Sequence, residues 1–507
     1  MIDINWQKLQ NGSDIRGVAL TGVEGEEVNL TPDVIATIGK AFTVWLSQQK
    51  GKQPSDLVIS VGRDSRLSGE TLMNALMGSI ELLGVKVYDF AMASTPAMFM
   101  STINEGFNCD GAIMLTASHL PFNRNGLKFF TAKGGLEKQD ITDILTLAQK
   151  GEFPSNDKLG SIEKKDFMTV YANQFVTKIR EGVNHPDNWE KPLEGLKIIV
   201  DAGNGAGGFY ATKVLQPLGA DINGSQFLEP DGTFPNHIPN PENKEAMESI
   251  CQAVIRHQAD FGIIFDTDVD RSAAVDSQGK ELNRNKLIAL ISAIILQEHP
   301  HSSIVTDSIT SDGLTAFIEE ELQGKHHRFK RGYKNVINEA LRLNQEGRES
   351  WIAIETSGHA ALKENYFLDD GAYLVTKLLI ELAKLKLVNK DLTELIKTLK
   401  EPVESEEFRL IIKAENFKEY GNQVIEKLTE FSANQPDWNI VPNNYEGIRV
   451  SCTSESEQGW FLLRLSLHDP VLPLNVETNI QGGVKKIAQR LLTFFQEFEQ
   501  LNLKDLL

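Results

Sequence analysis

Short apolar runs alternate with longer amphipathic stretches up to about residue 400. Residues 31–49 carry apolar positions at helical spacing, and they begin with Thr31 and Pro32, which favour a helix N-terminus. The apolar run at 56–64 ends in a polar loop and predicts a strand. Residues 68–84 predict a helix with Ser68 as its cap and Gly84 as its stop. Further strands are predicted at 85–91 and 111–118, and such alternation favours βα units in a mostly parallel sheet.

The same order of elements recurs twice further along the chain. Residues 195–208 and 260–271 each contain an apolar strand run, the first leading into a helix and the second ending in carboxylates. Residues 302–322 and 349–362 repeat strand, polar loop and helix. Each polar loop follows the carboxyl end of a strand, where open α/β sheets bind ligands. We therefore predict α/β domains at 1–188, 189–283 and 284–400.

The last part of the chain has a different pattern. Strands are predicted at 402–413, 447–454, 459–469 and 472–479, and helices at 416–431 and 482–500. Short strands joined by tight turns favour an antiparallel α+β domain, which we place at 401–507. The predicted fold is thus three similar mixed α/β domains in series plus a C-terminal antiparallel α+β domain.

Composition narrows the classes of partner. The 507-residue chain has a formal net charge of −19, which disfavours nucleic acid or an anionic membrane as the main partner. The three cysteines, Cys109, Cys251 and Cys452, are far apart and predict reduced thiols rather than a disulfide framework. The N-terminus lacks the layout of a signal peptide, and no run of 18 apolar residues occurs. We expect a cytoplasmic protein with no membrane span.

Three aspartates follow the strand run at 261–265. Asp266, Asp268 and Asp270 alternate, so an extended loop would point all three carboxylates to one side. Close carboxylates repel one another unless a cation lies among them, and oxygen ligands suit Mg²⁺. A calcium-binding EF-hand loop is excluded, because Arg271 stands where that loop needs Gly and Ser277 where it needs Glu. The alternative is a solvated acidic loop.

A glycine-rich segment follows the strand run near residue 200. Gly203, Gly205 and Gly208 fit the G-x-G-x-x-G spacing of dinucleotide-binding loops, and Asp221 follows at a suitable distance. No other segment is typical of hydride transfer. We therefore favour a tight turn that lets the next element pack on the sheet.

Two further loops carry polar groups, one suited to sugar hydroxyls and the other to phosphate. In the segment ETSGHA, Glu355 can accept hydrogen bonds from sugar hydroxyls, while Ser357 is a candidate helix N-cap; both interpretations can hold together. In RLSLHDP, Arg464 offers bidentate donors to phosphate, with Ser466 and His468 in support. The alternative for that segment is a plain hairpin turn.

The segment TASHLPFNRNGLK contains the candidate nucleophile. Ser118 does not lie in a G-x-S-x-G motif, so acyl transfer is unsupported. If Ser118 faced the three aspartates, a phosphoserine there would add an anionic ligand for Mg²⁺. Lys128 could then act as a general base or contact the phosphate. An ordinary serine at a strand end is the alternative.

Taken together, these loops resemble the α-D-phosphohexomutase family of phosphoglucomutases, phosphomannomutases and phosphoglucosamine mutases. The resemblance covers nearly the whole chain, in order, at residues 13–17, 61–69, 116–128, 266–271, 331–336, 355–360, 369–371 and 464–470. It implies four domains around a central cleft and phosphorylation of Ser118. It also implies one Mg²⁺ per chain, held by Ser118, Asp266, Asp268 and Asp270.

The resemblance also assigns roles to single residues. It implies that Arg271 steadies the serine loop, that His359 and Lys128 are proton-transfer candidates, and that His119 belongs to the catalytic set. Substrate binding is implied for Arg16, Lys334, Glu355, Ser357, Arg464, Ser466 and His468.

The implied reaction interconverts hexose 1-phosphate and hexose 6-phosphate, of glucose or mannose, through a bound hexose 1,6-bisphosphate. The chain departs from the usual motifs at Leu120, where Asn is usual, and at Leu467 and His468, where Gly and Thr are usual. If the altered loop at Leu467 and His468 bound the substrate's non-reacting phosphate more weakly, a different activity would be favoured, that of a glucose-1,6-bisphosphate synthase. The loops would also suit a phosphoglucosamine mutase. A catalytically silent regulatory relative is a further alternative, which the presence of Ser118, the three aspartates, Glu355 and His359 disfavours. Expected partners are small hexose phosphates, and the protein is expected to be a monomer or a homodimer.

Overall fold

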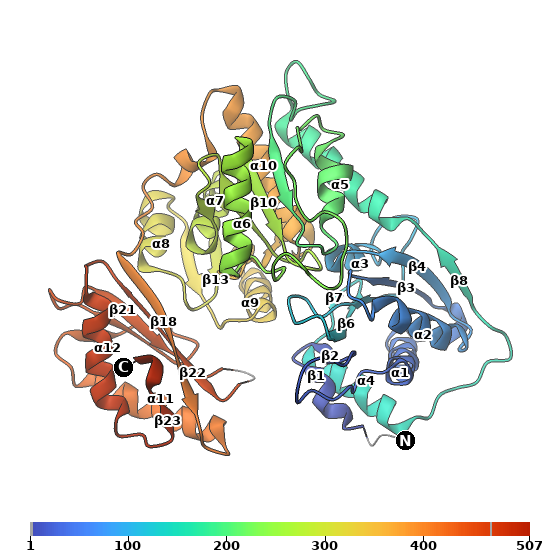
Figure 1. Cartoon of the computed structure of the whole chain (residues 1–507), viewed down its shortest axis with the longest axis horizontal. Helices are drawn as coiled ribbons and strands as arrows, with labels where there is room; N and C mark the ends of the chain where they lie inside the picture. Colours follow the sequence, from blue (N-terminus) through green and yellow to red (C-terminus); the bar gives the residue numbers. More distant parts are fainter. Residues whose placement is uncertain (1–3, 467–468, 507) are drawn as a thin grey trace. The chain divides into compact units, whose positions relative to one another are not determined.

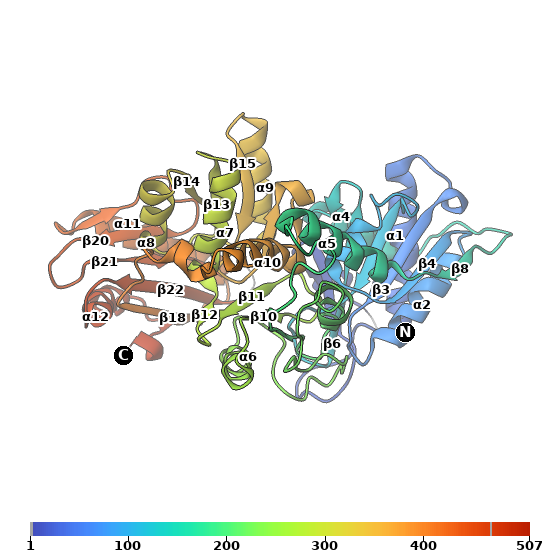
Figure 2. The same cartoon turned by 90° about the horizontal axis from the view of Figure 1, so that it is seen from above.

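The computed structural model describes residues 4–466 and 469–506, and the chain divides into two compact units. The first unit comprises the chain up to residue 283 together with 357–394. The second comprises 284–356 and the chain from 395 onward. Figures 1 and 2 show the elements of each unit. Among the described residues, no helix is both long and apolar enough to cross a membrane.

The first sheet of unit 1 has the order β1-β2-β6-β5-β3-β4-β8, with β7 paired to β6. Its strands are β1 (Gln10–Asn11), β2 (Asp14–Val18), β3 (Val58–Arg63), β4 (Lys86–Met92), β5 (Gly111–Leu115), β6 (Arg124–Thr131), β7 (Gly134–Gly135) and β8 (Ser161–Lys164). Strands β3, β4, β5 and β8 pair in parallel, whereas β1, β2, β6 and β7 pair antiparallel. The prediction of a mostly parallel sheet is therefore wrong here. The reason is that the short connection 116–123 between β5 and β6 cannot span the crossover that a parallel pair needs.

Helices cover both faces of this sheet. On one face lie α1 (Pro32–Lys50), α2 (Gly69–Glu81) and α4 (Lys138–Lys150) (Figure 1). Their buried apolar residues form one core with the sheet. On the other face lie α3 (Thr95–Met100) and α5 (Phe167–Val183), where Phe167 stacks on Phe90 of β4 with ring centroids 5.0 Å apart. Apolar residues on both faces explain why the central strands read as continuous hydrophobic runs.

The predicted helix ends are only partly correct. Helix α1 begins as expected, because the Val34 amide donates to Thr31 Oγ1. Ser68 precedes α2 but makes no capping hydrogen bond, and its hydroxyl instead accepts one from Asn125 Nδ2 at 2.9 Å. Ser68 thus occupies the predicted cap position, but its side chain does not cap the helix, because a partner on a distant strand engages it.

The rest of unit 1 contains a smaller sheet of order β12-β11-β10-β9. Its elements are β9 (Ile198–Asp201), a π-helical segment (Tyr210–Leu215), α6 (Lys244–His257), β10 (Phe261–Phe265), β11 (Ser272–Asp276) and β12 (Glu281–Leu282). The unit also includes the antiparallel pair β16 (Ala360–Leu362) and β17 (Leu368–Asp369), followed by α10 (Gly371–Leu387). Tyr210 and Thr376 share a 2.6 Å hydrogen bond, so α10 packs on the second α/β region.

Unit 2 contains a parallel strand set and an antiparallel sheet. The parallel strands β14, β13 and β15 lie with α7, α8 and α9. Their bounds are α7 (Arg284–Glu298), β13 (Ser303–Thr306), α8 (Asp312–Ala316), β14 (Lys325–Arg328), α9 (Tyr333–Gln345) and β15 (Ser350–Ile354). Residues 355–359 lead from β15 into strand β16 and not into a helix. The prediction of Ser357 as a helix N-cap is therefore wrong.

The C-terminal sheet has the order β19-β20-β21-β22-β18-β23, and every pair is antiparallel. Its elements are β18 (Glu404–Ile412), α11 (Phe417–Ala433), β19 (Trp438–Ile440), β20 (Ile448–Cys452), β21 (Gly459–Leu463), β22 (Val471–Thr478), α12 (Gly483–Phe495) and β23 (Leu501–Asn502). Helices α11 and α12 share the sheet's apolar core. The predicted fold class, three α/β domains plus an antiparallel α+β domain, is confirmed.

Candidate active site

Ser118 lies in the connection that returns antiparallel from β5 to β6. Its backbone is in the left-handed region with φ of 50°, which is uncommon for a residue with a side chain. The Ser118 amide donates to Thr116 Oγ1 at 2.9 Å, and the residue is buried. The loop therefore holds this serine in an unusual conformation, a property often found at functional sites.

A buried arginine holds the same loop in place through hydrogen bonds. Arg66 is 1% exposed, and its guanidinium donates to four carbonyl oxygens of the serine loop, those of Ser118, Leu120, Pro121 and Arg124. Asp64, which is also fully buried, accepts from the Arg66 amide and pairs with its Nε at 3.3 Å. The sequence suggested 61–69 only through the family resemblance. The local signal was a polar loop with an arginine a few positions after an apolar strand.

The acidic loop 266–270 joins β10 to β11 by a tight turn. Val269 has φ of 67°, so the loop is not extended as the alternation suggested. The carboxylates of Asp266, Asp268 and Asp270 nevertheless converge, with one oxygen from each lying within 4.8 Å of the others. All three are almost fully buried, which excludes the solvated-loop alternative.

The glycine-rich segment packs directly against this acidic loop. A Cβ on Gly205 would lie 2.6 Å from the Thr267 carbonyl oxygen, and the Ala206 amide donates to that oxygen at 2.8 Å. Asp221 pairs with Lys197 at 3.2 Å. The favoured interpretation of the segment, a tight turn for close packing, is confirmed.

Ser118 and the acidic loop meet in unit 1. Ser118 Oγ lies 3.2 Å from Asp266 Oδ2 and 3.0 Å from Arg271 Nη2. Arg271 also pairs through Nε with Asp266 Oδ2 at 3.1 Å, and its Nη2 lies 2.6 Å from His119 Nδ1. The predicted proximity of Ser118 to the aspartates is confirmed, and Arg271 links the two loops.

Burial and neighbouring charges shift the pKa values of the aspartates. Burial and the neighbouring carboxylates of Asp270 and Asp268 raise the pKa of Asp266 well above its ordinary value. Burial would also raise the pKa of Asp270, but Lys128, His359 and Arg271 hold it below its ordinary value. Lys128 Nζ lies 3.1 Å from Asp268 Oδ2 and also contacts Asp270. Lys128 and Arg271 balance part of this buried negative charge, and a bound cation would balance more of it.

The aspartate cluster fits a divalent metal ion. Oδ1 of Asp268 and Oδ1 of Asp270 are buried and have no hydrogen-bond partner among the described residues. Carboxylate oxygens are the ligands that Mg²⁺ prefers, and such a site leaves positions open for a phosphoryl oxygen. The donor set is therefore suited to a hard cation.

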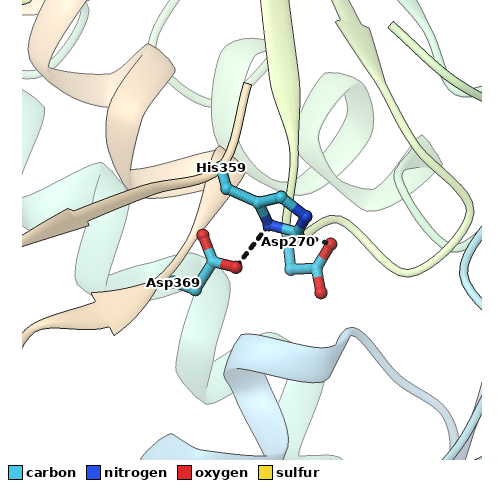
Figure 3. Close-up of side chains that lie close together, drawn as sticks. All are labelled: Asp270, His359 and Asp369. Atoms are coloured by element: carbon cyan, nitrogen blue, oxygen red, sulfur yellow. Dashed lines mark hydrogen bonds and ion pairs between the residues drawn. The ribbon is translucent and has the colours of Figure 1, made fainter. Parts of the chain in front are cut away.

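A histidine and a further aspartate lie beside this cluster. His359 Nδ1 is 2.5 Å from Asp369 Oδ2 and 3.9 Å from Asp270 Oδ1 (Figure 3). Burial would lower the pKa of His359, but the carboxylates of Asp369 and Asp270 outweigh it and raise that pKa to about 9. Residue-by-residue reasoning had not identified Asp369, although the segment 369–371 belongs to the family resemblance.

Arg16 lies next to the serine loop. It is on β2, pairs with Asp14 Oδ2 at 2.8 Å, and donates to the Thr116 carbonyl oxygen. Unit 1 thus brings Arg16, Ser118, His119, Lys128, Asp266, Asp268, Asp270, Arg271 and His359 into one region. Ser357, in the same unit, is buried, and its hydroxyl has no hydrogen-bond partner among the described residues.

The other predicted substrate-binding residues belong to unit 2. Glu355 Oε1 accepts from the Gly332 amide at 2.5 Å, which holds the segment containing Lys334 beside the end of β15. Arg464 and Ser466 lie between β21 and β22, where the Ser466 amide donates to the Val471 carbonyl oxygen. Burial lowers the pKa of Arg464. Arg464 and Ser466 thus lie in the connection between two strands, as predicted, while Leu467 and His468 lie outside the described residues.

A cavity adjoins the serine loop. It measures about 570 Å³ and is bounded by 119–122 and 233–243. His119 is on one wall, while Phe122 and Phe234 supply aromatic surface. This volume is typical of a small-molecule site.

Fold and site together define a multidomain α/β enzyme of phosphoryl transfer, in which a strained serine faces a carboxylate cluster. Comparison of the sequence with models of known protein families supports this class. Domain I of phosphoglucomutase/phosphomannomutase, an alpha/beta/alpha domain, matches residues 7–155, domain II matches 173–279, and domain III matches 283–402. The chain belongs to the phosphoglucomutase/phosphomannomutase family, and it is a hexose phosphate mutase.

Individual relatives align over nearly the full length. A phosphoglucomutase of Neisseria gonorrhoeae is 29% identical over 479 residues, covering 94% of each chain. A phosphomannomutase/phosphoglucomutase of Pseudomonas syringae is 30% identical over 455 residues, covering 89% of this chain and 90% of the relative. The crystal structure of a family protein from Burkholderia thailandensis superposes with a TM-score of 0.77 at 27% identity, covering 97% of this chain and 98% of that one.

Proposed function

We propose that this protein interconverts glucose or mannose 1-phosphate and the corresponding 6-phosphate, with Ser118 as the phosphoryl carrier. The observation that carries the proposal is the position of Ser118 Oγ, 3.0 Å from Arg271 Nη2 and 3.2 Å from Asp266 Oδ2. A hydroxyl held between a guanidinium and a buried carboxylate cluster is suited to gain and lose a phosphoryl group.

The reaction needs two transfers. In the first, the bond between Ser118 Oγ and phosphorus breaks, and a free hydroxyl oxygen of the hexose phosphate bonds to that phosphorus as its proton leaves. The product is a hexose 1,6-bisphosphate. In the second, the other phosphoryl group returns to Ser118 Oγ, and the sugar oxygen that carried it takes up a proton. Arg271 stabilises the charge that develops on Oγ in both directions.

Proton transfer and phosphate contact fall to different side chains. His359 is proposed to accept and deliver the proton of the reacting sugar hydroxyl. Burial would lower the pKa of Lys128, but Asp268 and Asp270 raise it well above its ordinary value. Its Nζ is also held in ion pairs with Asp268 and Asp270, which favours the phosphate contact over the general base that the sequence left open.

Mg²⁺ is the proposed metal. Asp266, Asp268 and Asp270, with the phosphoryl group on Ser118, would hold it, and the bound ion would withdraw charge from the phosphoryl oxygens. The chain's own residues carry the remaining roles. For the distal phosphate and the sugar hydroxyls we propose Arg16, Lys334, Glu355, Ser357, Arg464, Ser466 and His468.

The test uses purified protein with glucose 1-phosphate and a trace of glucose 1,6-bisphosphate. Formation of glucose 6-phosphate, followed by ³¹P NMR, is the expected result, and mannose and glucosamine 1-phosphates run in parallel rank the sugars. The Ser118→Ala variant should lose at least about 10³-fold in kcat. Equal activity of the variant and the parent protein would refute the phosphoserine mechanism.

The same experiment separates the bisphosphate synthase alternative. That activity would release free bisphosphate in stoichiometric amounts when a second phosphoryl donor is supplied. Intact mass before and after incubation with the bisphosphate reports directly whether residue 118 carries the group. An unchanged mass in active protein would contradict the proposed carrier.

A further inference from the structure

The His359 ring is held by a carboxylate that comes from the adjacent strand. His359 directly precedes β16, and β16 pairs antiparallel with β17 so that Ala361 lies opposite Asp369. This register places Asp369 Oδ2 at 2.5 Å from His359 Nδ1 (Figure 3). The contact thus follows from strand pairing and does not depend on a flexible loop.

The Asp369 carboxylate is itself held in place. Its second oxygen, Oδ1, accepts a hydrogen bond from the Ala360 amide at 2.9 Å. The residue is 8% exposed, so solvent competes little for either oxygen. A carboxylate with both oxygens engaged cannot rotate without losing a hydrogen bond, which makes it a rigid acceptor.

The backbone of His359 is tied to the residue that binds the serine. Arg271 and His359 form an isolated antiparallel β-bridge, and the Ser272 amide donates to the Gly358 carbonyl oxygen. Arg271 in turn donates to Ser118 Oγ at 3.0 Å. The position of the imidazole is therefore coupled to the position of the nucleophile.

The orientation of the ring has a chemical consequence. A carboxylate can only accept, so Nδ1 is the nitrogen that carries the proton in this contact. The second nitrogen, Nε2, points away from Asp369 (Figure 3). Partners of this kind fix the tautomer and orientation of an imidazole in many sites.

We propose that Asp369 is a positioning residue that fixes the ring orientation of His359 and keeps a proton on Nδ1, so that Nε2 is the nitrogen that exchanges the proton of the reacting sugar oxygen. This inference rests on the proposed function for the identity of the reacting oxygen. The orientation of the ring and the proton on Nδ1 can be tested without turnover.

The first test is Asp369→Asn in the full-length protein. The amide keeps the size of the side chain and an acceptor for Ala360 but presents its NH₂ group to His359 Nδ1. We expect kcat to fall about 10²-fold or more while KM changes less than about threefold. The matched control is Asp370→Asn, a neighbouring buried carboxylate that bonds to Tyr171 and Asn365. Its kcat should stay within about threefold of the parent.

A double-mutant cycle then decides whether Asp369 acts through His359. If it does, the variant carrying both His359→Gln and Asp369→Asn should be no slower than His359→Gln alone. Independent, multiplying losses in kcat would overturn the proposal, because they would show that Asp369 acts elsewhere.

The final test reads the ring directly. The chain has 10 histidines, and ¹⁵N-histidine labelling with His359→Gln as the assignment variant identifies the His359 ring signals. The parent should show a proton on Nδ1, and Asp369→Asn should shift that signal. An unchanged ring signal overturns the positioning role even if activity is lost. Because this measurement needs no substrate, failure of the mutase assay in the parent would refute the proposed function separately.

Discussion

Ser118 Oγ lies 3.2 Å from Asp266 Oδ2, although 148 positions of sequence separate the two residues. The contact joins the return connection of the first sheet to the strand end of the second. It places a hydroxyl beside three buried carboxylates whose oxygens are suited to bind a cation.

Removal of the metal tests this relationship. Dialysis against a chelator should abolish mutase activity, and Mg²⁺ should restore it better than Ca²⁺, because phosphoryl transfer favours the smaller ion's geometry. Asp268→Asn should raise the Mg²⁺ concentration needed for half-maximal activity by about tenfold or more. The control is Asp276→Asn, which removes a buried carboxylate at the end of the adjacent strand β11. An equal Mg²⁺ requirement in Asp268→Asn and the parent would contradict the metal site.

The Arg66 contacts predict a defect in catalysis more than in folding. Arg66→Lys keeps the charge but loses the planar set of donors that reaches four loop carbonyls. We expect kcat to fall about 10- to 100-fold, because a small displacement of the nucleophile is costly. Arg63→Lys changes a residue of the same segment that donates to the Asp64 carbonyl oxygen, and it should stay near parent activity. Comparable losses in the two variants would argue against a specific role for Arg66.

The glycine-rich segment at 203–208 packs against the acidic loop 266–270, and a single added methyl group can disturb this packing. Gly205→Ala places a Cβ 2.6 Å from the Thr267 carbonyl oxygen, so one of the two loops must move. We expect a loss of about 1–3 kcal/mol in stability and a larger Mg²⁺ requirement. Gly78→Ala, in α2, meets no atom within 4 Å and should be neutral or slightly stabilising. Unfolding curves and metal titrations of both variants check this, and a fully active Gly205→Ala would contradict the packing argument.

Asp370 predicts a specific dependence of stability on pH. Its carboxylate accepts from Tyr171, Asn365 and the Tyr373 amide, yet burial dominates and raises its pKa to about 7. Between about pH 4 and pH 7 the folded state therefore keeps a proton that the unfolded chain releases, so stability falls as pH rises through this window.

The variant Asp370→Asn cannot ionise at this position and should lose that part of the pH dependence. Compared with the parent protein, it should gain on the order of a few kcal/mol between about pH 5 and pH 8. Thermal unfolding of both proteins across this range is the measurement. Parallel curves would show that Asp370 has an ordinary pKa.

Local pattern was sufficient for most elements of the fold and for the candidate loops. The cap at Thr31, the strand β10 and the antiparallel character of the C-terminal sheet follow from residue spacing and turn signals within a few positions. The candidate site residues could also be identified from local sequence pattern. Ser118 and the three aspartates stand at strand ends, where polar groups in an apolar context are informative.

Long-range contacts decided the features of the fold and of the site that do not follow from local pattern. The antiparallel pairing of β6 depends on the short connection 116–123 from β5 and on β2, which lies much earlier in the chain. The hydroxyl of Ser68 is engaged by Asn125 and not by its own helix. The Arg66 guanidinium donates hydrogen bonds to the loop around Ser118, more than 50 positions away. The Asp369–His359 contact depends on the register between β16 and β17. The sequence alone determined which residues could carry the chemistry, because their types and spacing are local. Only the tertiary structure decided which side chains orient them, because those partners are brought together by folding.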